Sequence, residues 1–166
     1  MILGLSLQAF TLVHVVISIV ALAAGIVVVA GMLAGSRLPG WTALFLATTV
    51  LTSVTGFLFP ATAILPSHIV GAISLAVLAI AIIALYGFRL AGAWRWIYVG
   101  SAIVAFYLNA FVAVAQAFLK VAVLQPLAPT QSEPPFLVAQ LAVLAVFVAL
   151  GILAVIRFRP AAIQAA

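Results

Sequence analysis

Of the 166 residues, 69% are hydrophobic and only 4% are charged, so the chain has too few polar side chains to coat a water-exposed surface. The six Lys and Arg residues outnumber the one acidic residue, but they are scattered at the ends of apolar runs, which excludes a nucleic-acid-binding patch. The absence of cysteine excludes disulfides and thiolate chemistry. The expected main partner is the lipid bilayer.

Five apolar stretches are each long enough to form a transmembrane helix. A helix needs about 20 mainly apolar residues to cross the hydrocarbon of a bilayer, and breaks rich in Pro, Gly or charge separate the stretches. We therefore predict an all-α integral membrane protein, a single transmembrane domain over residues 1–166 whose short connections make neighbours antiparallel. The expected helices cover residues 5–34, 41–59, 67–86, 94–119 and 136–156.

Basic residues predict the orientation of this bundle. With five crossings, all the arginines fall on one side and Lys120 falls on the other. Positive residues mark the cytoplasmic side of a membrane, so we expect the N-terminus outside and the C-terminus in the cytoplasm. A bundle of four crossings is disfavoured because it would place the C-terminal arginines outside or require the second apolar run to be re-entrant. The arginines are Arg37, Arg89, Arg95, Arg157 and Arg159.

Small and hydroxyl side chains predict how the first two helices pack. In the first, Gly31 and Gly35 form a small-xxx-small pair, and Ala21 and Gly25 continue this narrow face, which permits close approach of a neighbouring helix. In the second, three threonines lie on one side, where their hydroxyls can bond their own backbone or cross to a neighbour. They are Thr48, Thr52 and Thr55.

Both histidines of the chain lie in predicted helices, where polar residues are costly and therefore informative. His14 shares a helix face with Ser18 and the small residues of the first stretch. His68 opens the third stretch, with Ser67 as the expected N-cap. Counting residues along the helices places both histidines at the outer edge of the hydrocarbon.

The fourth stretch carries a polar stripe that runs from the middle of the bilayer to its outer face. Asn109, Gln116 and Lys120 follow one another at helical spacing. A buried amide without partners is costly in hydrocarbon, so Asn109 requires a hydrogen bond from another helix or from a ligand. The next loop adds Glu133, the sole acidic residue. We predict one outer pocket formed by His14, His68, Asn109, Gln116, Lys120 and Glu133.

Each of these residues also has a purely structural explanation. His14 can bond a carbonyl or hydroxyl across a helix interface, and His68 can be a helix-start residue in the headgroup zone. Lys120 can extend its side chain to the interface. Glu133 fits the acidic first turn of the fifth helix, and the amides can hold helices together.

Several ligands fit the predicted pocket. Two neutral imidazoles on different helices can hold haem b axially or join a metal site, although zinc or copper would need further ligands, and Glu133 is the only carboxylate available. A quinone or other lipid-like molecule could instead use a histidine with the amides of Asn109 and Gln116. Cofactor identity is left open between these classes.

Two other functions compete with ligand binding. The chain could be a non-catalytic accessory or assembly subunit of a membrane complex, or form a homo-oligomer, with its polar groups serving helix packing. It could also be a small-solute pore lined by the Asn109 stripe. Enzymatic hydrolysis or phosphoryl transfer is not expected, because the sequence has no glycine-rich phosphate loop, no paired carboxylates and no serine–histidine–acid set.

Several segments of the chain resemble an uncharacterised family of small polytopic bacterial inner-membrane proteins. They are Tyr107–Phe111, Phe118–Lys120 and Leu127–Phe136 in the last third of the chain, together with the turn Gly56–Pro60. The resemblance implies a multi-pass protein of the bacterial inner membrane. It carries no catalytic residue and no function to transfer.

Overall fold

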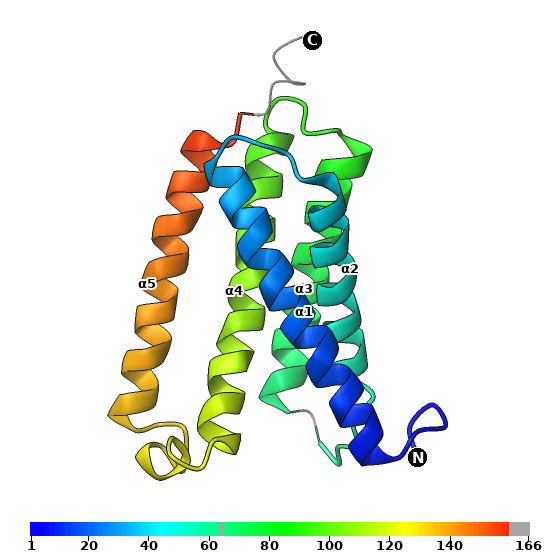
Figure 1. Ribbon diagram of the computed structural model, residues 1–166, viewed down its shortest axis with the longest axis vertical. Coiled ribbons are helices and arrows are strands. Elements are labelled where there is room, and N and C mark those ends of the chain that lie inside the picture. The colour runs from blue at the N-terminus through cyan, green and yellow to red at the C-terminus, as the bar shows by residue number, and fades with distance from the viewer. Residues whose placement is uncertain (64, 160–166) are drawn as a thin grey trace.

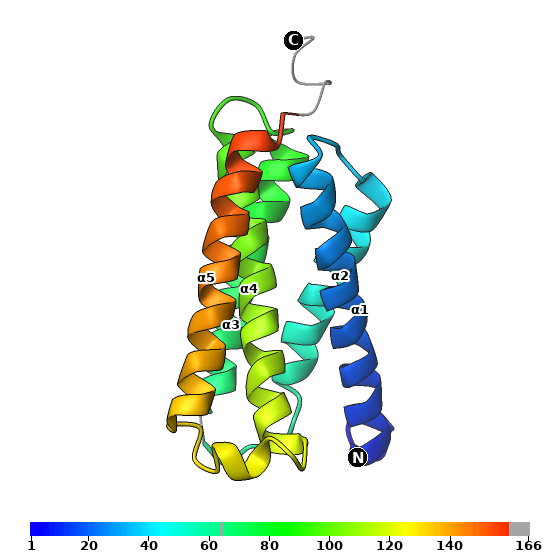
Figure 2. The same ribbon diagram turned by 60° about the vertical axis from the view of Figure 1, so that its left-hand side comes forward.

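The chain folds into a bundle of helices that run side by side along one axis (Figures 1 and 2). The computed structural model describes residues 1–63 and 65–159, and within them it contains helices and no β-strand. This confirms the predicted all-α class. The helices of the bundle are α1 (Leu7–Leu33), α2 (Pro39–Gly56), α3 (Pro66–Ile82), α4 (Trp94–Lys120) and α5 (Pro134–Arg157).

Four spans in the described residues are long and apolar enough to cross a membrane, and they belong to α1, α3, α4 and α5. The α2 helix is not among them, because its 18 residues include five threonines and a serine and are less apolar. A helix of that length is about 27 Å long, close to the roughly 30 Å of bilayer hydrocarbon. Length and composition thus identify four spans where the sequence predicted five.

Local sequence explains where the helices begin. The Ser6 side chain caps α1 by accepting a hydrogen bond from the Ala9 N–H at 3.2 Å. The helices α2, α3 and α5 each begin with proline, whose fixed φ suits the first helical position. The predicted N-cap Ser67 is wrong, because Pro66 already starts α3 and makes Leu65 the N-cap.

Two chain reversals lie at the same end of the bundle. After α1, Gly35 adopts φ +70°, a conformation that glycine enters without steric cost. After α3, the chain continues as a π-helical turn, η1 (Ile83–Gly87). It then places Leu90, at φ +63°, with its side chain fully buried. The buried leucine fixes the α3–α4 loop onto the core.

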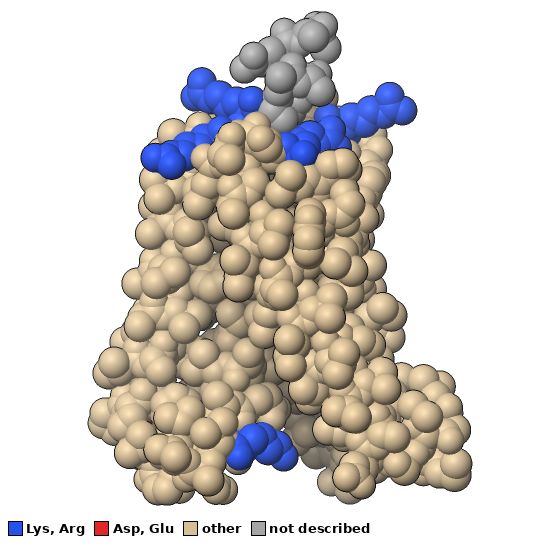
Figure 3. Space-filling model, viewed as in Figure 1, with Lys and Arg blue, Asp and Glu red and all other residues tan. Residues whose placement is uncertain are grey.

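The two ends of the bundle differ in charge. The arginine end carries Arg37, Arg89, Arg95, Arg157 and Arg159, which lie in or beside the α1–α2 loop, the α3–α4 loop and the end of α5. Figure 3 shows this ring of blue side chains at the upper end. The opposite end, called here the histidine end, carries His14, His68 and Lys120. Residues 160–166, predicted to be cytoplasmic, lie outside the described residues.

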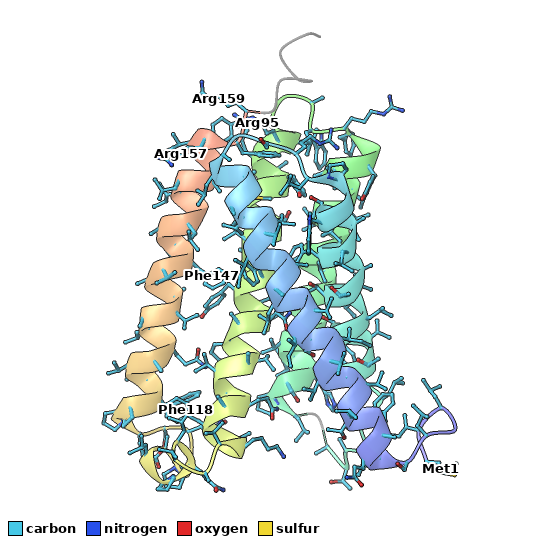
Figure 4. The ribbon with its side chains drawn as sticks, in the orientation of Figure 1. Met1, Arg95, Phe118, Phe147, Arg157 and Arg159 are labelled. Atoms are coloured by element: carbon cyan, nitrogen blue, oxygen red, sulfur yellow. The ribbon has the colours of Figure 1, made fainter. Side chains whose placement is uncertain are left out.

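The densely packed core lies in the half of the bundle nearer the arginine end. On α1, all buried residues except Phe10 lie between Ala21 and Met32. On α4, all except Phe118 lie between Tyr98 and Asn109. At the centre, the Phe106 ring packs edge to face against Phe45 and Phe147, at centroid distances of 5.9 and 4.9 Å, and Figure 4 shows Phe147 between α5 and α4.

Candidate functional site

The histidine end is less densely packed and is hollowed. Figure 3 shows a recess that opens at the lower end of the molecule between α1 and α4. We call it the histidine-end cleft and define it by the facing halves of these helices, residues 7–20 of α1 and 110–120 of α4. Each half contributes a single buried residue, Phe10 or Phe118. Lys120 ends α4 at the mouth of the cleft.

His14 joins α1 to the end of α2. Its Nδ1 lies 2.7 Å from the Thr55 Oγ1, and its half-buried ring meets the Phe59 ring edge to face at 5.2 Å. The Thr55 hydroxyl itself donates to the Leu51 carbonyl at 2.7 Å. The structural explanation of His14 was a hydrogen bond to a hydroxyl across a helix interface. The structure shows this contact between α1 and α2.

His68 caps the start of α3 and also packs on the end of α2. Its Nδ1 accepts a hydrogen bond from the Leu65 N–H at 3.2 Å, which satisfies one of the free donors of a helix N-terminus. Its ring stacks on Phe57 with a centroid distance of 5.6 Å and an interplanar angle of 15°. The segment from Thr55 to Phe59 therefore contacts both histidines. The hydrogen bonds of both rings are made by Nδ1 and leave Nε2 without a partner among the described residues.

Asn109 lies where the core ends and the cleft begins. It is 9% exposed, and apart from Phe118 it is the last buried residue of α4. Its Nδ2 has no hydrogen-bond partner among the described residues. The Oγ1 of Thr52 is also buried without a partner there. The Oε1 of Gln140 is the third such atom. Because a buried polar atom without a partner costs about 1–3 kcal/mol, Asn109 is one of three residues with such an atom, and it is the only predicted pocket residue among them.

Gln116 and Lys120 continue the face of Asn109 toward the mouth of the cleft. They follow it by about two and three turns of α4, and both are exposed. The predicted stripe is thus buried at Asn109 and open at its other end. An exposed lysine and glutamine can approach a ligand without first breaking a protein contact.

Glu133 serves the last loop. It is the N-cap of α5 and not a first-turn residue as predicted. Its carboxylate accepts hydrogen bonds from the Thr130 N–H and hydroxyl, at 3.2 and 2.8 Å, and from the Ser132 N–H at 3.1 Å. Partial desolvation raises the pKa of the Glu133 carboxyl, but these hydrogen bonds outweigh it and hold the pKa below its usual value.

Two glutamines that the sequence reasoning did not select tie the last part of the chain to α4. The Gln140 amide is 7% exposed and donates from Nε2 to the Phe111 carbonyl at 3.1 Å. The Gln131 Nε2 donates to the Ala115 carbonyl at 2.7 Å. The signal for Gln140 was present, since it is an amide within a predicted span. Its interhelical bond explains how α5 is held at the histidine end.

Two cavities lie away from the predicted site. A small one of about 30 Å³ at the arginine end is bordered by Thr42 and Tyr98. An apolar groove of about 420 Å³ runs between α4 and α5 past Tyr107 and Phe147. Neither is lined by a predicted site residue. The described residues also contain no group of three or more His, Cys, Asp or Glu side chains that could hold a metal ion.

No protein-family model, curated protein or solved structure matches this chain. The chemistry of the histidine-end cleft therefore has to be derived from its own residues. The two helix halves supply the His14 imidazole and the exposed Gln116 and Lys120. Asn109, one residue before the α4 half, adds a buried amide nitrogen without a partner among the described residues. His68 lies at the start of the neighbouring helix α3.

Proposed function

We propose that this membrane protein binds a small amphipathic molecule in the histidine-end cleft, with Asn109 as its deepest polar contact. The observation that carries the proposal is the Asn109 Nδ2, which is buried without a hydrogen-bond partner among the described residues. Asn109 lies one residue before the half of α4 that borders the cleft. Water does not reach the hydrocarbon depth of a membrane freely, so such a donor needs a partner there. A bound molecule with an acceptor oxygen supplies it.

The other predicted residues support this role in different ways. His14 and His68 offer their Nε2 atoms, and Gln116 and Lys120 offer exposed polar groups along the same face of α4 as Asn109. The Glu133 carboxylate holds the loop before α5 through the N–H groups of Thr130 and Ser132. It therefore shapes the histidine end of the bundle without itself contacting the ligand. The proposed site is therefore a row of polar side chains within mainly apolar surroundings.

The test is to purify the full chain in mild detergent and compare small molecules extracted from wild type and Asn109→Leu by mass spectrometry. We expect a compound present at near-stoichiometric amount in wild type and depleted about tenfold in the variant, the effect of losing one buried hydrogen bond. Thr49→Val is the control, because it removes a buried polar group whose hydrogen bond stays within its own helix, α2. Identical extracts from wild type and Asn109→Leu would reject the proposal.

A second function, a subunit of a membrane complex or homo-oligomer, is favoured by the exposure of α5. Only 11% of its span is buried, against 28% to 33% in the other three spans. In that case a neighbouring protein would supply the partner of Asn109. Stable copurification of another protein, lost in Asn109→Leu while the small-molecule extracts stay equal, would favour this function over ligand binding.

We also propose five crossings in a bacterial inner membrane, with the histidine end outside and the arginine end in the cytoplasm. The five arginines at one end support the orientation. The α2 helix supports the fifth crossing because it lies beside α1 and is about as long as the hydrocarbon is thick (Figure 2).

The topology can be tested without background, because the chain has no cysteine. A membrane-impermeant maleimide applied to intact cells, with the outer membrane permeabilised, should label Val123→Cys at the histidine end and not Ala91→Cys at the arginine end. Both positions are exposed and lie outside the α-helices. Lysis should make both react. Labelling of Ala91→Cys in intact cells would reverse the orientation, and labelling of both would point to an even number of crossings between them.

A further inference from the structure

The contacts of His14 indicate which of its ring nitrogens carries the proton. The Leu51 carbonyl can only accept and lies 2.7 Å from the Thr55 Oγ1, so we assign the single hydroxyl proton of Thr55 to this bond. The Thr55 Oγ1 can therefore only accept from the ring nitrogen 2.7 Å away. Neutral His14 thus carries its proton on Nδ1, and its Nε2 is left as an acceptor.

The hydrogen bonds of His68 fix the opposite arrangement. A backbone N–H can only donate, and the Leu65 N–H points to the His68 Nδ1 at 3.2 Å. That nitrogen must offer its lone pair, so neutral His68 carries its proton on Nε2. The two histidines therefore present different groups, an acceptor on α1 and a donor on α3.

This difference disfavours a haem held by both histidines. Axial ligation of iron through both Nε2 atoms would need a lone pair on each. For His68 that requires moving its proton to Nδ1 and breaking the bond that caps α3. Haem also carries two carboxylates, whereas Lys120 is the one lysine or arginine among the described residues of this end.

The same groups match a neutral molecule with two oxygen functions. Asn109 and His68 are donors that suit carbonyl oxygens, and the His14 Nε2 suits a hydroxyl. Counted along their helices, Asn109 lies about 16 Å from the end of α4, His14 about 10 Å from the start of α1 and His68 about 3 Å from the start of α3. Polar contacts at different depths suit a ligand with an oxygen at each end of a ring.

Resting on the proposed function, we propose that the ligand is a quinone-type molecule, a ring with two oxygen substituents and an apolar tail. The recess in Figure 3 lies between α1 and α4 at the histidine end of the bundle, where the expected membrane boundary lies. The apolar tail can therefore stay in the bilayer while the ring enters the cleft. The carbonyl form is held by the donors, and the hydroxyl form gains the His14 acceptor.

The test uses the full chain in lipid nanodiscs, titrated separately with decylubiquinone and with haemin. We expect decylubiquinone to bind, with an affinity about tenfold weaker in Asn109→Leu and in His14→Phe. Thr48→Val is the control, since its hydroxyl bonds only its own helix, and it should bind as wild type does. In parallel, ¹⁵N NMR of the two histidines should show one Nδ1-protonated and one Nε2-protonated ring.

Two results would overturn the quinone assignment while leaving the proposed function standing. One is a haemin complex with a six-coordinate, low-spin spectrum that is lost in both His14→Ala and His68→Ala. The other is no binding of decylubiquinone by wild type, although an extracted compound still depends on Asn109. Equal tautomers at both histidines would remove the chemical basis of the assignment. Equal extracts from wild type and Asn109→Leu would instead reject the proposed function.

Discussion

Replacing Gly25 with leucine is expected to lower the free energy of unfolding by about 1–3 kcal/mol, the usual cost of overpacking a core. A Cβ at Gly25 would lie 2.7 Å from two ring atoms of Phe106. That ring cannot move aside easily, because Phe45 and Phe147 pack against it. Thermal melting of the detergent-purified protein measures the loss.

The controls separate this contact from a general effect of glycine replacement. A Cβ at Gly100 meets nothing within 4 Å, so Gly100→Leu should be neutral or stabilising because leucine favours helix over glycine by up to about 1 kcal/mol. Adding Phe106→Ala to Gly25→Leu should restore part of the stability, because removing the Phe106 ring makes room for the new leucine side chain. Equal destabilisation by Gly25→Leu and Gly100→Leu would show that α1 and α4 are not closely packed at Gly25.

The helices were predictable because their signals are local. Long apolar runs and the Pro, Gly and charged breaks between them lie within a few residues of each helix end. The helices predicted in this way include α2 (Pro39–Gly56), expected over residues 41–59, although its threonines leave it less apolar than the four spans. The narrow face of α1 was also predictable, but its partners were not, since Phe106 packs on Gly25 and Leu38 on Gly31 through contacts made only in the folded chain.

The candidate site was predictable in its residue types and less so in its contacts. The sequence indicated that Asn109 needs a partner, and the structure shows its Nδ2 buried without one in the described residues. The partners of the histidines are set by tertiary packing onto the end of α2 and by the start of α3, one residue earlier than expected. The proton positions that favour a quinone over haem depend on these contacts and could not be derived from spacing.

Arg95→Ala is expected to release the end of α5 and to lower the free energy of unfolding by about 1–3 kcal/mol, the cost of leaving a polar group without its partner. The Arg95 Nη1 donates to the Phe158 carbonyl at 2.5 Å and lies 3.4 Å from the Val155 carbonyl. Carbonyls at a helix C-terminus lack partners within the helix and attract positive charge. The guanidinium also lies 3.9 Å from the centre of the Trp96 ring.

The effect should be concentrated in α5 because this helix has the least buried span, with 11% of its residues inside the protein. Hydrogen exchange of residues 150–158 should rise in Arg95→Ala, and Arg95→Lys should recover part of the protection, since lysine keeps the charge but not the planar stack. Arg157→Ala is the control, because its guanidinium makes no hydrogen bond in the described part of the chain. Equal exchange in Arg95→Ala and Arg157→Ala would mean that charge alone holds this end. A larger effect at Arg95 would show that α5 is fixed by directed contacts at both ends, Arg95 at one and Gln140 at the other.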